Sequence, residues 1–255
     1  MIDMNFTYTF IIINLFVWIP WLWIYKVNPY FIKRALNNRL KEHPQWNDVK
    51  KIEALLGKLY RGVNASRLSK KELKRLSIKN DDFVYGEVDF LSFFTLLERC
   101  QPKTGEIFYD LGSGSGKAVF SAALFFNLGK AYGIELLHDL YNLSNEQIKK
   151  CRSLIKKNDK KYYDTISKKV MKINFINRNF LETNIKSADI IYINATCMNP
   201  ATWDGIIQKL IELKSGSRII VNTKKIEHER FKLLYSGGEL MSWGLGRVRI
   251  YIKTS

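Results

Sequence analysis

After Gly105, short apolar runs alternate with stretches of helical periodicity, and this alternation constrains the fold more than any other feature of the chain. The apolar runs are strand candidates and cover residues 107–111, 131–135, 173–176, 190–194, 218–222 and 247–253. Strands that alternate with helices are joined by right-handed crossovers into a parallel sheet. The last segment differs, because residues 241–243 and 247–253 flank a short Gly-Leu-Gly and predict a hairpin. We therefore expect an α/β fold whose open parallel sheet ends in an antiparallel carboxyl-terminal hairpin.

The amino-terminal segment has a different character, because no charged residue lies between Asp3 and Lys26. A helix over residues 5–25 would be about 30 Å long, close to the thickness of the hydrocarbon core of a bilayer. Tryptophans cluster at its carboxyl end and basic residues follow, as the positive-inside rule requires of a cytoplasmic flank. The sequence predicts a single-pass membrane anchor with the rest of the chain in the cytoplasm. An interfacial helix and a soluble core helix are the alternatives.

The chain divides into three segments by pattern. Residues 1–26 are the expected transmembrane anchor, residues 27–83 form a basic helical segment, and residues 84–255 hold the alternating pattern. Within the second segment, Ser69 is a candidate N-cap for a helix over the KKELKRL that follows it. Another helix is expected between Val88 and Cys100.

Lysine and arginine number 41 against 24 aspartates and glutamates, which gives a formal net charge of +17. Such an excess favours an anionic partner, either lipid or nucleic acid, and the lysine-rich run over residues 149–172 is the candidate surface. A biased amino-acid composition would also explain the net charge, and a solvated helix face would also explain the lysine-rich run. The three cysteines and three histidines are too scattered for a disulfide framework or a metal site, so we expect no metal: Cys100, Cys151, Cys197, His43, His138 and His228.

The strongest local signal is FYDLGSGSGKAVFSAALFF over residues 108–126. In this pattern a strand runs into Gly112, Gly114 and Gly116, and a helix begins directly after them. Glycines allow a tight turn and a close approach of backbone to ligand, and the helix N-terminus offers unpaired N–H groups. A phosphate loop is disfavoured, because Lys117 is followed by alanine instead of serine or threonine.

Two acidic residues restrict the class of ligand that this site can bind. Asp110 ends the first strand, where its carboxylate would repel a pyrophosphate but suits a positively charged ligand such as S-adenosylmethionine. Glu135 ends the next strand and can accept both ribose hydroxyls of a nucleoside. Because Glu135 also fits NAD, a dehydrogenase is the alternative to a methyltransferase at this point. Helix capping or pairing with lysines would explain both acids without a ligand.

Three further segments complete a resemblance to a known family: VYGEVDF at 84–90, NRNFLE at 177–182 and IIYINATCMNP at 190–200. With DLGSGSGKAV and AYGIEL, their order and spacing resemble the class I S-adenosylmethionine-dependent methyltransferases of DOT1 type, the non-SET histone-lysine methyltransferases. The resemblance covers residues 55–253. It implies a Rossmann-like sheet, S-adenosyl-L-methionine as cofactor, and a protein substrate with an acceptor lysine.

The resemblance also implies roles for single residues. The cofactor-binding residues would be Tyr85, Gly86, Glu87, Asp110, Gly112, Gly114, Gly116, Glu135, Asn179, Phe180 and Asn194. Among them, Glu135 would hold the ribose, Phe180 would stack on the adenine, and Asn194 would lie beside the lysine channel. The family's Asn-Asn-Phe is Asn194, Ala195 and Thr196 here. Asn179 also departs from the family, which has aspartate at this position.

Methyl transfer to an amine needs positioning and a neutral nitrogen more than a strong base. Asn194 and Tyr85 are therefore the candidate catalytic residues, with Thr196, Met198 and Trp203 as candidate channel walls, although ordinary packing at a strand end would also explain them. We expect a membrane-anchored lysine methyltransferase. The alternatives are a methyltransferase for a small molecule, a lipid headgroup or a membrane protein, and a catalytically silent cofactor-binding module.

Overall fold

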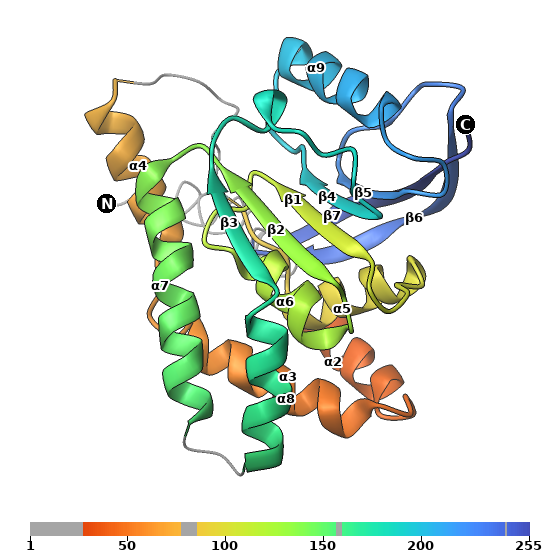
Figure 1. Cartoon of the computed structure of the whole chain (residues 1–255). Helices are drawn as coiled ribbons and strands as arrows, with labels where there is room; N and C mark the ends of the chain where they lie inside the picture. Colours follow the sequence, from red (N-terminus) through yellow and green to blue (C-terminus); the bar gives the residue numbers. More distant parts are fainter. Residues whose placement is uncertain (1–27, 78–85, 157–159, 243) are drawn as a thin grey trace, which may run out of the picture.

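The structure is a computed structural model that describes residues 28–77, 86–156, 160–242 and 244–255 (Figure 1). Its α-helices are α2 (Asn28–Leu40), α3 (Trp46–Leu59), α4 (Ala65–Arg75), α5 (Phe90–Arg99), α6 (Lys117–Phe125), α7 (His138–Ile155), α8 (Lys160–Val170) and α9 (Pro200–Ile211). A short 3-10 helix, η3, covers Phe180–Glu182. The strands are β1 (Ile107–Leu111), β2 (Lys130–Glu135), β3 (Ile173–Asn177), β4 (Ile190–Asn194), β5 (Arg218–Asn222), β6 (Phe231–Met241) and β7 (Gly244–Lys253).

The strands form one seven-stranded sheet in the order β3-β2-β1-β4-β5-β7-β6. The first five are parallel, whereas β7 pairs antiparallel with both β5 and β6. The order reverses between β1 and β4, and the carboxyl ends of β1, β2 and β4 therefore meet at a switch point where ligands bind in open α/β sheets. The sheet agrees with the expectation from the sequence.

The hairpin differs from its prediction. Met241 pairs with Gly244, and both glycines of the Gly-Leu-Gly lie inside β7. Strand β6 also begins at Phe231, ten residues before the predicted segment. Most of its first half is exposed, and it contains Gly237 and Gly238, so it lacks the apolar run that marks a buried strand.

The two faces of the sheet carry separate apolar cores. On one face, Phe108, Ile190 and Ile220 pack beneath helices α3, α5, α6, α7 and α8. On the other face, Ile191, Ile193 and Val221 pack in a core with residues of α9, and among the described helices α9 and η3 cover this side of the sheet in Figure 1. Strand alternation produces this division, because successive side chains point to opposite faces.

The amino-terminal helices join the first of these cores. Leu56 and Leu59 of α3 are fully buried with α6 and α7. Helix α4 begins at Ala65, where the Asn64 side chain accepts from the Arg67 N–H at 3.0 Å. The expectation that Ser69 is an N-cap is therefore wrong: the helix begins one turn earlier, and Ser69 lies inside it.

The expected fold is corrected at the predicted transmembrane helix. Among the helices that the structure describes, none combines the length and the apolar composition needed to cross a membrane. The longest of them, α7, has 18 residues but carries charged side chains along its length. Residues 1–26, where we placed the anchor, lie outside the described residues. None of the described helices supports the membrane anchor or the single-pass membrane placement, and neither is carried further.

Candidate active site

A cavity of about 350 Å³ opens at the carboxyl ends of β1, β2 and β4. This volume lies within the range of small-molecule sites, about 300–1,000 Å³. The residues that line it are Ser69, Gly86, Glu87, Val88, Asp110, Leu111, Gly112, Ser113, Gly114, Lys117, Ala118, Glu135, Leu136, Leu137, Leu140, Asn179, Phe180, Leu181, Tyr192, Asn194, Met198 and Thr202. Most of the predicted cofactor residues are thus brought together at one site.

The glycine-rich turn forms the floor of this cavity. Gly112, Gly114 and Gly116 have φ values of 85°, 54° and 82°, in the left-handed region that favours glycine. Gly116 is also the N-cap of α6, and a Cβ there would overlap the ring of Phe175. Gly116 does not line the cavity. Its role is to adopt the backbone conformation that connects β1 to α6 and to leave room for the Phe175 ring of β3.

Glu135 is fixed by backbone groups on both sides. Its Oε2 accepts from the Gly114 N–H at 2.7 Å and its Oε1 accepts from the Leu137 N–H at 2.8 Å. Burial raises the pKa of the Glu135 carboxyl, while these N–H groups act in the opposite direction. The carboxylate has four acceptor positions in all, so it keeps capacity for a further donor, as a contact with a ribose hydroxyl would require.

Asp110 is the least satisfied carboxylate of the site. It is 3% exposed and lines the cavity, and no group in the described part of the chain donates a hydrogen bond to it. Burial and the neighbouring Glu135 raise its pKa well above the usual value. A buried carboxylate without a partner is costly, and the cavity is the direction from which a cation could reach it.

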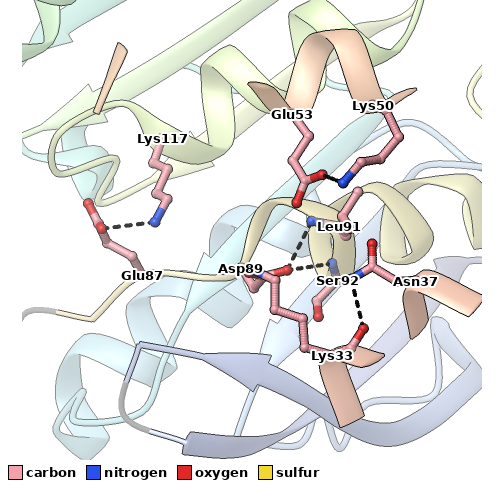
Figure 2. A network of polar contacts seen from close by, with 9 residues as sticks. All are labelled: Lys33, Asn37, Lys50, Glu53, Glu87, Asp89, Leu91, Ser92 and Lys117. Carbon is pink, nitrogen blue, oxygen red and sulfur yellow. Dashed lines mark hydrogen bonds and ion pairs between the residues drawn. The ribbon is translucent and has the colours of Figure 1, made fainter. Parts of the chain in front are cut away.

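Residues 86–89 form a segment, called the cover here, of which Gly86, Glu87 and Val88 line the cavity. Glu87 accepts from the Ser115 hydroxyl at 2.7 Å and pairs with the Lys117 ammonium at 3.3 Å, and Figure 2 shows the latter two side chains pointing toward each other. On the other side, the Glu87 N–H donates to the Ser242 hydroxyl, and Val88 pairs with Met241 at the end of β6. This cover is therefore attached to both the glycine-rich turn and the hairpin.

The cover continues into α5, as Figure 2 also shows. Asp89 caps this helix by accepting from the Leu91 and Ser92 N–H groups at 3.1 and 3.3 Å. Lys33 of α2 pairs with the other oxygen of Asp89 at 2.9 Å. Tyr85, the remaining predicted residue of this segment, lies outside the described residues.

Asn194 connects the end of β4 to the cover. Its Nδ2 donates to the Gly86 carbonyl at 3.1 Å, and its Oδ1 accepts from the Thr196 hydroxyl at 2.9 Å and from Asn222 Nδ2 at 3.4 Å. Both ends of the amide are thus engaged within the protein. We expected Asn194 to lie beside the site, and it does line the cavity, but its contacts are those of a positioning residue.

The expected adenine and channel residues divide into two groups. Asn179 and Phe180 line the cavity, and the Asn179 side chain caps η3 by accepting from the Leu181 N–H at 2.9 Å. Met198 also lines the cavity. Thr196 and Trp203 are absent from its lining, and Thr196 instead bonds to Asn194 and Thr223.

Sequence reasoning missed several lining residues. Tyr192 pairs in register with Asp110 on the adjacent strand, so both side chains project into the same face. Its hydroxyl accepts from Asn222 Nδ2 at 2.9 Å, and burial raises its pKa together with the nearby charge of Asp110. Strand alternation could have identified Tyr192, because Asn194 is two residues further along β4. For Ser69, which comes from α4, no local pattern pointed to the site.

The strand order, with an antiparallel β7 inserted between β5 and β6, defines the Rossmann-like fold of class I methyltransferases. The family model described as "Histone methylation protein DOT1" matches residues 67–248, well over half of the chain. The chain therefore belongs to the DOT1 histone methylation family, and the resemblance drawn from the sequence is confirmed.

Relatives of known name agree with this assignment. The chain is 32% identical over 148 residues to a histone-lysine N-methyltransferase, H3 lysine-79 specific, from Eremothecium gossypii, covering 54% of this chain and 24% of that one. It is 26% identical over 125 residues to a protein-lysine N-methyltransferase from Saccharolobus islandicus, covering 49% and 66%. The chain spans only about a quarter to a third of the fungal relatives it matches.

Among solved structures, the magnesium protoporphyrin IX methyltransferase of Synechocystis with bound S-adenosylmethionine aligns with a TM-score of 0.48 and 11% identity. The alignment covers 79% of this chain and 90% of that one. At this score the assignment of the fold rests on the strand order and not on the superposition.

Proposed function

We propose that this chain is an S-adenosylmethionine-dependent methyltransferase that methylates a lysine side chain of a protein. The observation that carries this proposal is the Asp110 carboxylate, which is buried at the cavity with no donor from the described residues. A positively charged ligand would relieve the cost of that burial. Membership of the DOT1 family and the names of the relatives support the reaction type.

The residues of the cavity fit this cofactor in each of its parts. Asp110 would bind the ammonium of the methionine moiety, and Glu135 keeps lone pairs for the ribose hydroxyls. Leu136 and Phe180 would offer apolar surface to the adenine, and Asn179, which lines the same cavity, would be available to its polar edge. The glycine-rich turn keeps side chains out of the space between these groups.

The cofactor supplies a methyl group bound to a sulfonium, which is transferred in line to a nucleophilic amine. The protein has to bind and orient both partners and exclude water. Residues 86–89 close over the cavity, and Asn194 holds them through the Gly86 carbonyl. Burial beside the apolar Met198 would favour the neutral form of an entering lysine amine, because desolvation lowers the pKa of an ammonium.

The acceptor that we propose is a lysine side chain of a protein. The fungal relatives are named for lysine 79 of histone H3, which makes histone H3 the first substrate to test. Ala195 and Thr196 replace the family's Asn-Phe beside Asn194, so the entrance for the acceptor differs from the family pattern. A lipid or nucleic-acid surface stays a prediction from the net charge alone.

The test combines binding with transfer. We expect the chain to bind S-adenosylmethionine in calorimetry, and to transfer radiolabelled methyl groups to lysines of histone H3 or of a total protein extract. A small-molecule fraction of the same cells serves as the competing acceptor. Label in small molecules alone would identify a different acceptor class, binding without transfer would indicate a silent module, and absence of binding would refute the proposal.

Asn194→Ala is expected to slow methyl transfer by roughly 30-fold, the effect of about 2 kcal/mol from leaving the Gly86 carbonyl without its donor. Affinity for S-adenosylmethionine should change less than about fivefold, because Asp110 and Glu135 are untouched. Single-turnover rates and calorimetry on one preparation separate the two quantities. Thr196→Val is the matched control, since it removes one donor to Asn194 but keeps the bond to Gly86. A lower melting temperature with a normal rate per folded molecule would assign Asn194 to packing alone.

A further inference from the structure

The buried stripe of helix α4 is polar, although a helix that packs on a core normally buries apolar side chains. Ala65, Ser69 and Glu72 are the buried residues of α4, with exposures of 4%, 1% and 1%. Buried polar groups are costly unless hydrogen-bonded, so both Ser69 and Glu72 need a partner.

Glu72 has its partners within the protein. Its two carboxylate oxygens accept from the His138 and Asp139 N–H groups, each at 2.9 Å. These N–H groups belong to the first turn of α7, whose own preceding residue, Leu137, provides no side-chain cap. Glu72 therefore caps α7 from a different helix, and its burial is explained.

Ser69, one turn before Glu72, has no such explanation. It lines the cavity, and no described residue is hydrogen-bonded to its hydroxyl. A serine inside a helix commonly donates to the carbonyl four residues earlier, as Ser121 does to Lys117 at 2.8 Å. Ser69 is not seen to make this bond, and two of the residues that line the cavity with it, Leu137 and Leu140, are apolar. The hydroxyl therefore lies at the cavity without a hydrogen-bond partner among the described residues.

We propose that Ser69 binds the ribose of the cofactor, as the counterpart of Glu135. This inference rests on the proposed function. Ala65, one turn before Ser69 on α4, packs with Leu137 and Leu140 at the beginning of α7. Ser69 lines the same cavity as Glu135, Leu137 and Leu140. A ribose hydroxyl both donates and accepts, whereas an ionised carboxylate can only accept. Glu135 would accept a hydrogen bond from the ribose hydroxyl, and the Ser69 hydroxyl would donate one to the ribose oxygen.

The experiment measures binding of S-adenosylhomocysteine, the demethylated form of the cofactor, by calorimetry. Ser69→Ala should weaken binding by about three- to tenfold, the range for one neutral hydrogen bond. The loss should shrink toward unity for an analogue that lacks the ribose hydroxyl contacted by Ser69, so both singly deoxygenated analogues are tested. Ser66→Ala is the matched control, because Ser66 lies on the same helix but does not line the cavity.

The outcomes distinguish this inference from the proposed function. If the natural chain binds S-adenosylhomocysteine and Ser69→Ala binds it equally well, the ribose contact is refuted and the proposed function stands. An equal loss for the ribose and both deoxygenated ligands would assign Ser69 a structural role and also refute the contact. If the natural chain does not bind at all, both fail. Melting curves without ligand establish that each variant is folded before binding is compared.

Discussion

Asp110→Asn is expected to bind S-adenosylmethionine at least about 100-fold more weakly than the natural chain, while resisting unfolding better in the absence of ligand. The amide keeps the size of the side chain but cannot neutralise an ammonium. Removing one partner of a buried charge pair costs about 3–5 kcal/mol, or a factor of about 150 and more in affinity. Calorimetry with the cofactor measures the first effect. Equal affinity of the two proteins would remove Asp110 from the site.

The gain in stability follows from the pKa of Asp110. Burial and Glu135 raise this pKa well above its value in the unfolded chain, so the folded protein binds more protons than the unfolded one in the pH range between the two values. The free energy of unfolding must therefore decrease as the pH rises through that range. Asp110→Asn removes this contribution, and urea unfolding at acidic and neutral pH should show a flatter decrease in the variant. A steeper decrease of the free energy of unfolding with pH in the variant would contradict a raised pKa for Asp110.

Gly116→Ala is expected to lower the free energy of unfolding by about 3 kcal/mol. A left-handed backbone costs a non-glycine residue about 1 kcal/mol, and overpacking adds about 1–3 kcal/mol because the new Cβ would overlap the Phe175 ring. Gly112→Ala is the matched control. Gly112 has nearly the same φ, 85° against 82°, but a Cβ there meets no atom within 4 Å, so only the first cost applies.

Urea unfolding of the two alanine variants tests this difference directly. Adding Phe175→Leu to Gly116→Ala should recover part of the lost stability, since the smaller side chain makes room for the new methyl group. Equal destabilisation at both glycines would show that backbone strain alone matters, and the packing of β3 over the turn would then have no special part in the fold.

Much of the sheet could be predicted because its strands are short, apolar and bounded by turns. The bounds of β1, β4 and β5 agree with their predictions, and β2 and β3 each extend by one residue. The first half of β6 could not be found in this way. It lies at the edge of the sheet, where one side has no neighbouring strand and exposed Lys232, Leu233 and Leu234 give no alternation.

For the site, residues at strand ends could be predicted from local sequence, whereas contacts between distant parts of the chain could not. Asp110, Glu135 and the glycine-rich turn lie at strand ends, so their proximity follows from a parallel sheet. The partners of Asn194 could not be derived, because Gly86 and Asn222 come from distant parts of the chain. The expected anchor found no support in the described structure, because it falls on residues 1–26, outside the described residues. A charge-free run indicated a membrane helix, but no helix among the described residues meets that description.

The capping of α7 by Glu72 makes two helices one cooperative unit. Local opening events in proteins free hydrogen-bonded groups together when their partners are shared. In the first turn of α7, the His138 and Asp139 N–H groups keep their bonds to Glu72 only while α4 is folded and in place. Fluctuations that release α4 would therefore expose the amides of His138 and Asp139 to solvent hydrogen exchange, although both belong to a helix more than sixty residues further along the chain. Hydrogen exchange at the beginning of α7 would therefore report whether α4 is folded and in place.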